Sequence, residues 1–416
     1  MNNVEKNKKC CGCGQCADIC PKKCITMKLN KNGFIRPIID NKKCILCNKC
    51  VKSCPTINII ESSNTIHDIK SYAVWMNSED ILQSSSGGVF YALARNFIIE
   101  KRGSVIGCTL MPNNKAIHIC INTIKDLTRL QGSKYIQSNL TGMFALVKKK
   151  INQNEYILFS GLPCQIAALY KYLGTLSNSS YLYTIELICH GVPSFYAVKG
   201  ALKTLKVKQI YSFRTKFIDA SQKNCFHISV KGKPQIPKDA YIYDKETDKS
   251  IILNRKYDLF YKFFFSDLAL NDICYKCKYS KIPRISDVSL ADLWGNKHPF
   301  QSNYDKGISL VLCNNERGNN LIKNNKDLFY HSIQWEQFLF GNPNIITNRD
   351  FLYKYRISNL LHILKFIPPT FWDLLLKYNP KKYLSWKKYK RMNPSKILRD
   401  RVQKFIKENK NYQWKQ

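Results

Sequence analysis

The chain has 416 residues, of which 44% are hydrophobic, and its formal net charge at neutral pH is +37. Its length predicts two or three domains, while its longest apolar stretch, residues 360–376, is interrupted by charges and prolines and does not predict a membrane span. The positive charge favours an acidic partner. Since no helix-turn-helix, RNP or zinc-finger motif accompanies it, nucleic acid is not among the predicted partners.

One cysteine pattern occurs twice within residues 1–60. Three cysteines are spaced three residues apart, and a Cys-Pro pair follows four residues later. This run wraps 4Fe–4S clusters in two-cluster ferredoxins, where the fourth thiolate of each run binds the other cluster. We therefore predict a ferredoxin-type domain over residues 1–60, with one cluster held by Cys10, Cys13, Cys16 and Cys54, and the second by Cys44, Cys47, Cys50 and Cys20.

Other uses of these cysteines fit the pattern less well. A disulfide framework needs an oxidising compartment, yet the chain opens without an apolar signal segment. Zinc ribbons use pairs of CxxC knuckles and not triplets. Cys11 and Cys24 fall outside the pattern and are predicted to be free or close to the cluster ligands. Between the two runs, residues Asn30–Gly33 predict the turn of a hairpin.

Residues 70–155 are predicted to form the first part of the main body. After a strand at 72–76, a Ser- and Gly-rich loop at 83–88 runs into a segment, 89–99, whose apolar residues repeat at helical spacing. A loop of this kind at a helix N-terminus can bind phosphate through unpaired N–H groups and the helix dipole. The alternative is that its small residues only permit tight helix packing.

Strands and helices alternate further along the chain. We predict strands at 104–110, 116–121, 156–160 and 181–189, and helices near 141–151 and at 166–173. This alternation favours an α/β body with some parallel pairing. Residues 205–255 predict a β-rich insertion and 257–270 a buried helix. The second part of the body is predicted over 156–345 and a basic helical tail over 346–416. The predicted fold class is thus an α+β ferredoxin module followed by an α/β body, for which the family resemblance given below implies a flavoprotein, and this basic helical tail.

A third set of cysteines lies in the body. Cys164 and Cys189 follow two consecutive predicted strands, so a parallel arrangement would bring both to the same edge of the sheet. Cys274 and Cys277 add a chelating pair, and the four thiols together could hold a third cluster. Two alternatives remain open: Cys164 could be a low-pKa nucleophile assisted by His190, and the CxxC pair could form a redox disulfide or half a zinc site.

Several of these segments together resemble the coenzyme F420 hydrogenase/dehydrogenase beta-subunit family. They span about residues 1–300 and comprise the ferredoxin module, Ser84–Phe90, Gly132–Ser138, Phe159–Gln165, Ile188–Gly191, Phe213–Lys216, Cys274–Cys277 and Ser286–Gly295. The tail is not covered beyond Asn348–Asp350. Relatives commonly have glycine before the acidic residue of the DLWG element, where this chain has Ala291.

The resemblance implies a flavoprotein with FAD next to a 4Fe–4S cluster. It places that cluster on Cys164, Cys189, Cys274 and Cys277, and flavin contacts on Ser86, Gly87, Gly88, Ser133, Lys134 and Tyr135. The implied function is an oxidoreductase passing electrons between the ferredoxin clusters and an organic substrate through FAD, in surface-polysaccharide biosynthesis as for many bacterial members. His190 and Asp292 are predicted to deliver protons.

Two rival functions are an electron-transfer subunit without a substrate of its own and a cysteine-nucleophile transferase with structural clusters. The predicted partners are an acidic electron carrier or redox subunit and a small-molecule or carbohydrate substrate. Residues 351–416 carry 17 Lys and Arg against 3 Asp and Glu, which suits either a helix on an anionic membrane or a solvated appendage over the core. The predicted location is cytoplasmic, with peripheral contact to the inner face of the membrane as a hypothesis.

Overall fold

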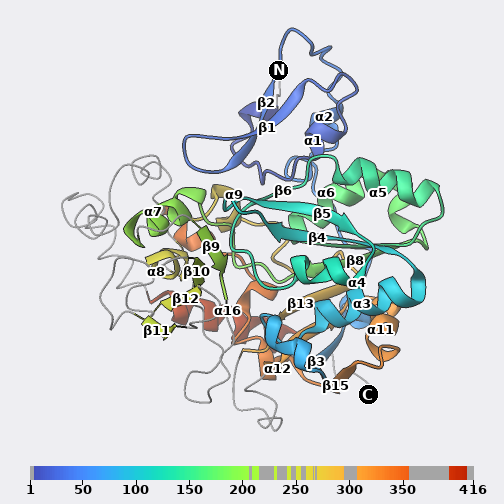
Figure 1. Cartoon of the computed structure of the whole chain (residues 1–416), viewed down its shortest axis with the longest axis vertical. Coiled ribbons are helices and arrows are strands. Elements are labelled where there is room, and N and C mark those ends of the chain that lie inside the picture. The colour runs from blue at the N-terminus through green and yellow to red at the C-terminus, as the bar shows by residue number, and fades with distance from the viewer. Residues whose placement is uncertain are drawn as a thin grey trace.

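The structure is a computed structural model that describes residues 4–205, 209–214, 229–231, 241–244, 250–253, 259–265, 267, 269–294, 307–355 and 393–409. A small N-terminal module stands on a larger body built around one nine-stranded sheet (Figure 1). A separate four-stranded sheet lies to one side of the body. Among the described residues, no helix combines the length and the apolar character needed to span a membrane.

The N-terminal module consists of short elements around a small core. They are the 3-10 helix η1 (Val4–Lys6), α1 (Gln15–Asp18), β1 (Ile25–Leu29), β2 (Ile35–Ile39) and α2 (Lys49–Lys52). Strands β1 and β2 pair antiparallel. The side chain of Asn30 closes their turn, because it accepts hydrogen bonds from the backbone N–H groups of Asn32 and Phe34, both at 3.0 Å. The hairpin predicted at this turn is confirmed.

The module is tied to the body by polar contacts from its inner side. The amide of Gln137 accepts a hydrogen bond from the Ile35 N–H at 2.6 Å and donates one to the Cys11 carbonyl at 2.8 Å. The carboxylate of Asp18 accepts from backbone N–H groups at the start of α5 (Met143–Asn152), including that of Phe144 at 3.1 Å. Since the N-terminus of a helix carries unpaired N–H groups, Asp18 caps α5 across the junction.

The large sheet is mixed, with the strand order β15-β3-β14-β13-β8-β7-β4-β5-β6. Its strands are β3 (Lys70–Met76), β4 (Ser104–Leu110), β5 (Ala116–Ile121), β6 (Ser138–Asn139), β7 (Ile157–Gly161), β8 (Leu182–Leu187), β13 (Val288–Asp292), β14 (Ser309–Cys313) and β15 (Leu328–Ser332). Strands β4, β7, β8 and β13 form a parallel block at its centre. The carboxyl ends of these four strands therefore meet at one edge, where α/β proteins bind ligands.

Helices cover both faces of the sheet. They are α3 (Val89–Lys101), α4 (Ile124–Leu127), α5, α6 (Pro163–Leu173), α7 (Phe195–Leu205), α8 (Leu259–Phe265), α9 (Asp272–Tyr275), α11 (Glu316–Lys323), α12 (Trp335–Phe338) and α16 (Pro394–Glu408). Successive side chains of a strand point to opposite faces. Val105 on β4 thus packs with α3, whereas its neighbour Ile106 packs with α5 and α6. The body is a three-layer α/β structure.

Most predicted elements are confirmed, and two differ at their ends. The helix predicted from residue 166 begins at Pro163, because proline at the first helical position needs no N–H partner and has a suitable φ. Cys164 therefore lies inside the first turn of α6. The strand predicted to reach residue 189 ends at Leu187, so Cys189 lies in the following turn.

The insertion and the buried helix are also borne out where they can be followed. The insertion contains β9 (Gln209–Ser212), β10 (Ser229–Lys231), β11 (Tyr241–Asp244) and β12 (Ser250–Leu253), which form the four-stranded sheet. Helix α8 falls within the buried helix predicted at 257–270, and it buries Phe260, Tyr261 and Phe264.

Only part of the predicted basic tail belongs to the described residues. Its helix α16 packs on the body through Val402, which is fully buried in a core with Trp335 and Phe338. Arg401 also forms an ion pair with Asp350 at 3.0 Å. The apolar face of α16 is therefore covered by the body, as expected for an appendage over the core. Residues 356–392 and 410–416 of the predicted tail lie outside the described residues.

Candidate functional site

The first predicted cluster group lies where the module meets the body. Burial raises the pKa of Cys10 to about 12 and also raises that of Cys16, and the nearby Cys54 thiol raises both further. A hydrogen bond with Cys11, followed by burial, raises the pKa of Cys13, and Cys16 is among its neighbouring thiols. Thiols from two distant segments thus share one space without an acidic side chain among them, a donor set that fits a 4Fe–4S cube.

The second predicted group is more exposed. Burial, followed by the thiols of Cys47 and Cys20, raises the pKa of Cys50. Cys24, which lies outside the ligand pattern, joins this group: its Sγ is 3.4 Å from that of Cys20, and Cys44 is another neighbour. Cys47 is exposed to solvent, whereas Cys13 and Cys16 of the first group are buried.

The four body cysteines also converge. Cys164 lies in the first turn of α6, Cys189 in the turn after β8, and Cys274 and Cys277 on and after α9. Burial raises the pKa of Cys189 to about 12, and Cys277 raises it further. Burial also raises the pKa of Cys274, and the neighbouring thiols of Cys189 and Cys277 raise it further. The structure therefore brings together the thiols of a predicted third cluster.

Cys11 is a fifth thiol at this place. Hydrogen bonds from Cys13 and then Cys164 lower the pKa of Cys11, so its side chain lies between the first cluster group and the body cysteines. Within the described residues, no three His, Cys, Asp or Glu side chains are already spaced as ligands of a single metal ion. In a cubane each thiolate binds a different iron atom, so its ligands stay farther apart than those of one ion.

A cavity of about 1370 Å³ opens at the carboxyl edge of the parallel block. It is lined by residues at the ends of β7, β8 and β13, by the Ser/Gly loop before α3, by the 130–136 segment and by α16. Five of the six predicted flavin residues line it, namely Ser86, Gly88, Ser133, Lys134 and Tyr135, as do both predicted proton-transfer residues, His190 and Asp292. Cys189 lines it as well, so the cavity adjoins the body cysteines.

Gly87 is the predicted flavin residue that does not line the cavity. A Cβ atom on Gly87 would lie 2.4 Å from the carbonyl oxygen of Val74 and 2.8 Å from the amide nitrogen of Ser309. Glycine is therefore required here by the close approach of two strands, a packing role but not the tight helix packing of the alternative prediction. Gly88 has φ +76 and serves as the N-cap of α3, a conformation that also favours glycine.

The two predicted flavin-binding loops are joined to each other. The backbone N–H of Ser133 donates to Oγ of Ser85 at 2.7 Å, and the side-chain amide of Gln131 donates to Oγ of Ser84 at 3.3 Å. Ser86 instead donates to the carbonyl of Ile308 at 3.0 Å. The loop before α3 is thus held between the 131–133 turn and strand β14, with the α3 N-terminus facing the cavity.

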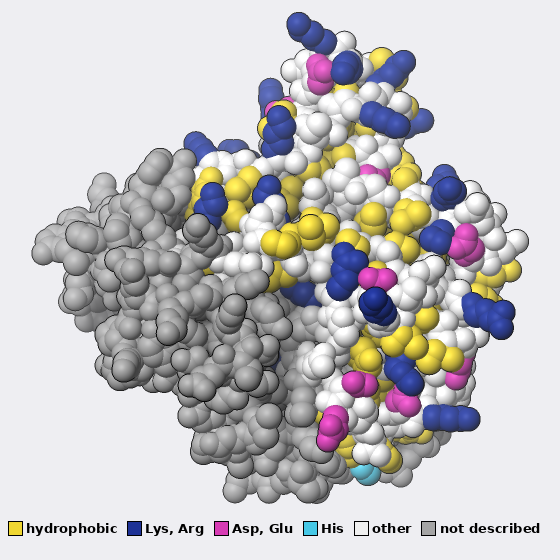
Figure 2. All heavy atoms as spheres, in the orientation of Figure 1, with side chains coloured by type: hydrophobic (Ala, Val, Ile, Leu, Met, Phe, Trp, Pro, Cys, Tyr) yellow, Lys and Arg dark blue, Asp and Glu magenta, His cyan; other side chains and the backbone are white. Residues whose placement is uncertain are grey.

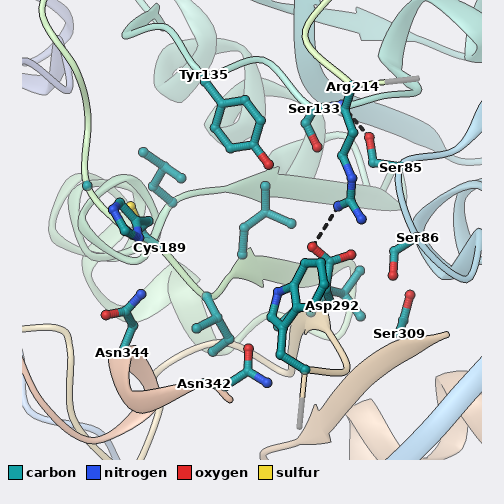
Figure 3. A pocket seen from close by; sticks show the side chains of 18 of the residues that line it. Ser85, Ser86, Ser133, Tyr135, Cys189, Arg214, Asp292, Ser309, Asn342 and Asn344 are labelled. Carbon is teal, nitrogen blue, oxygen red and sulfur yellow. Dashed lines mark hydrogen bonds and ion pairs between the residues drawn. The ribbon is translucent and has the colours of Figure 1, made fainter. Parts of the chain in front are cut away.

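Lys134 and Tyr135 extend this wall. The Lys134 ammonium donates to the carbonyls of Leu130 and Gln131 at 2.9 and 2.5 Å, and burial lowers its pKa to about 8. It therefore stabilises its own loop from inside. Burial raises the pKa of Tyr135 to about 12, so its hydroxyl keeps its proton at neutral pH. Figure 3 shows Tyr135, Arg214 and Asp292 facing the same space.

An ion pair adjoins Tyr135 in the cavity wall. Asp292 ends β13, and its Oδ2 is 2.6 Å from Nη1 of Arg214, whose side chain is only 2% exposed. The Arg214 guanidinium also stacks over the Trp294 ring, with its carbon 5.8 Å from the ring centroid. The sequence motif Phe213–Lys216 contained Arg214, but nothing local marked it as the partner of a residue 78 positions away.

His190 is held by a buried network that the sequence did not reveal. Its Nε2 lies 2.6 Å from Oδ1 of Asp267, and its Nδ1 lies 3.0 Å from Nη2 of Arg349. Arg349 also pairs with Asp267 at 2.9 Å. Both ring nitrogens therefore face protein groups and neither faces Cys164, whose own pKa is raised. This arrangement gives no support to a Cys164 nucleophile assisted by His190.

The remaining walls are apolar or come from the C-terminal segment. Leu187, Phe265 and Phe340 are 43, 37 and 46% exposed, and all three line the cavity. Such flat apolar surfaces suit an aromatic ring system. Leu398 and Arg399 of α16 also line the cavity. No periodicity in the sequence predicted that the tail would contribute to this site.

Comparison with known proteins adds family matches. Residues 154–334 match the family model for the C terminus of the coenzyme F420 hydrogenase/dehydrogenase beta subunit. Residues 9–58 match a 4Fe-4S dicluster domain, and residues 36–89 match a second model of the same description. No curated protein sequence matches the chain.

A solved structure with a distant likeness is one of several that match. It is a chain from the xenon-derivatised F420-reducing NiFe hydrogenase complex of Methanosarcina barkeri, with 14% identity and a TM-score of 0.44. The likeness covers 75% of this chain and 93% of that one. At this TM-score it carries no argument about function.

Proposed function

This chain belongs to the coenzyme F420 hydrogenase/dehydrogenase beta-subunit family, and from that premise we propose that it is an iron–sulfur flavoprotein oxidoreductase acting on an organic substrate. When bound, the clusters would supply one-electron transfer, and FAD its conversion into a two-electron or hydride step. The observation that carries the proposal is the single cavity that joins the predicted flavin residues, the predicted proton-transfer residues and Cys189.

The residues of the cavity fit a dinucleotide that has an anionic and an aromatic part. The N-terminus of α3, a helix of 13 residues, offers unpaired N–H groups for a pyrophosphate. Trp294 and the exposed faces of Leu187 and Phe265 would hold a ring system. The volume of about 1370 Å³ exceeds the roughly 300–1,000 Å³ of a typical ligand pocket and so favours a second molecule beside the cofactor. This favours an enzyme over an electron-transfer subunit without its own substrate.

The two predicted proton-delivery residues are both held by charged protein groups. His190 is engaged by Asp267 and Arg349, and Asp292 is engaged by Arg214. These two residues would therefore orient the walls of the cavity. The Tyr135 hydroxyl lines the cavity beside Ser133 and Arg214 and, because burial raises its pKa to about 12, it stays protonated at neutral pH and would donate a hydrogen bond to a substrate.

The proposal predicts about one noncovalent FAD per chain. Protein purified without oxygen and supplied with FAD should release the FAD on acid treatment. Dithionite should bleach the absorbance of the bound flavin, and a compound from a panel of oxidised metabolites should restore it. Failure of the reconstituted protein to bind FAD in a fluorescence titration would rule out the proposed function. Binding without reoxidation by any organic compound would support the electron-transfer subunit instead.

The hydrogen bond between the two flavin loops gives a finer test. Ser85→Ala removes the oxygen that accepts from Ser133 at 2.7 Å and should weaken FAD binding up to about tenfold, as expected for a net hydrogen bond of about 1 kcal/mol. Ser177→Ala is the matched control, because its hydroxyl also makes a 2.7 Å hydrogen bond, to the Gly174 carbonyl, but does not line the cavity. Equal FAD affinity of the two variants would show that the loops do not form the flavin site.

A further inference from the structure

The loop around Cys47 exposes apolar side chains beside one cluster group. Ile45 and Leu46 are 56 and 58% exposed, the highest values among the large apolar side chains described as exposed, and Cys47 between them and α2 is exposed too. Isolated exposed apolar residues are common, but two adjacent ones beside an exposed cluster ligand form a small apolar centre. We define the Cys47 surface as Lys42, Ile45, Leu46, Cys47, Lys49 and Lys52.

This surface is strongly basic. Lys42, Lys49 and Lys52 are all exposed, and none of their ammonium groups has an ion pair within the part of the chain that the structure describes. Residues 1–60 contain 12 Lys and Arg but only three acidic residues. Two of those, Glu5 and Asp18, accept backbone hydrogen bonds, and the third, Asp40, lies near Lys43 at 3.7 Å. Figure 2 shows dark blue basic side chains spread over the module with little magenta beside them.

The two cluster groups of the module differ in their surroundings. The first adjoins the body: Cys13 packs into a body core, and the Cys10 and Cys11 carbonyls accept hydrogen bonds from Asn271 and Gln137. The second group packs within the module, and Cys47 reaches solvent. The Cys47 surface is therefore the place where an external redox protein could come closest to the second cluster.

We propose that the Cys47 surface docks an acidic one-electron carrier protein. This proposal rests on the proposed function only because it requires that the clusters be loaded. Each encounter transfers one electron: the reduced carrier is oxidised and the module is reduced, with no bond formed and no proton moved. An apolar centre with a basic rim complements a carrier that has an apolar patch ringed by carboxylates. Transient redox interfaces are small, below about 1,200 Å², so a surface of this extent suffices.

The test uses the full, cluster-loaded chain and an acidic plant-type 2Fe–2S ferredoxin as the probe. Calorimetric titration of the two oxidised proteins at low ionic strength should show binding that weakens as salt screens the charges. Lys49→Glu with Lys52→Glu should weaken binding about tenfold or more, because it replaces attraction by repulsion at the rim. Leu46→Ser should weaken binding severalfold without changing the charge, which separates apolar contact from electrostatics. The rate at which reduced ferredoxin reduces the clusters should also fall in both variants, and more in the double lysine variant than in Leu46→Ser.

Lys148→Glu with Lys149→Glu is the matched control, since both lysines are exposed on α5 of the body and the change in net charge is identical. Equal weakening by both double variants, or by neither, would overturn the proposal. Self-association of the wild-type chain that Leu46→Ser abolishes would assign the surface to a second copy and also overturn it. Iron content must match wild type in each variant. Ferredoxin binding in a protein that takes up no FAD would leave the docking surface standing while the proposed function fails.

Discussion

Anaerobically reconstituted protein is expected to hold about twelve iron atoms per chain, as three 4Fe–4S cubes. Replacing Cys189 and Cys277 together by serine should lower the count to about eight, because it removes two of the four body thiols while both ferredoxin runs stay intact. Cys120→Ser is the matched control: Cys120 is half-buried on β5, outside the three cysteine groups, and the count should stay at about twelve. Iron analysis measures the number of iron atoms per chain, and low-temperature EPR of the reduced protein reports on the 4Fe–4S cubes.

A count of eight in the wild-type chain, unchanged by the double substitution, would remove the third cluster. Cys11, the fifth thiol beside the body cysteines, allows a test of which four thiols are the ligands. If Cys164, Cys189, Cys274 and Cys277 are the ligands, Cys11→Ser should keep about twelve irons and Cys164→Ser should not. The opposite result would make Cys11 the ligand in place of Cys164, with which it shares a hydrogen bond.

Arg214→Ala is expected to lower the free energy of unfolding by about 3–5 kcal/mol, because it leaves the largely buried Asp292 carboxylate without its cation. The side chains of Arg214 and Asp292 are 2 and 17% exposed. The same change should impair FAD binding, since the pair and Trp294 form one wall of the cavity. Denaturant unfolding of the reconstituted protein under argon measures the first effect, and a fluorescence titration with FAD measures the second.

Arg95→Ala is the matched control for this prediction. Arg95 pairs with Asp327 at 2.8 Å, a similar distance, but the two side chains are 40 and 38% exposed, so the loss should be at most about 1 kcal/mol. Removing both Arg214 and Asp292 should be less damaging than Arg214→Ala alone, because no uncompensated charge remains. A loss from Arg214→Ala no larger than that from Arg95→Ala would contradict the buried-pair argument.

Local sequence determined the elements and the chemistry that each could carry. Cysteine spacing predicted two cluster-binding runs, and dicluster-domain models match the same residues. Apolar periodicity predicted strands β4 and β5 at their observed bounds. It also placed α3 and α5 within about two residues at each end. These features depend on residues a few positions apart, where spacing sets which side chains share a face.

Only the tertiary structure decided which distant residues share a site. Cys11 contacts Cys164 although the two lie far apart in the chain. Asp267 pairs with both His190 and Arg349, so His190, which was expected to deliver a proton, is held by protein groups. Arg399 of α16 reaches the cavity only because Val402 packs that helix against the body. Such contacts follow from how sheet, helices and module pack, and no local period encodes them. The burial that raises the pKa of Cys10, Cys189 and Tyr135 arises in the same way, because it depends on everything that surrounds a side chain and not on the residues beside it in the chain.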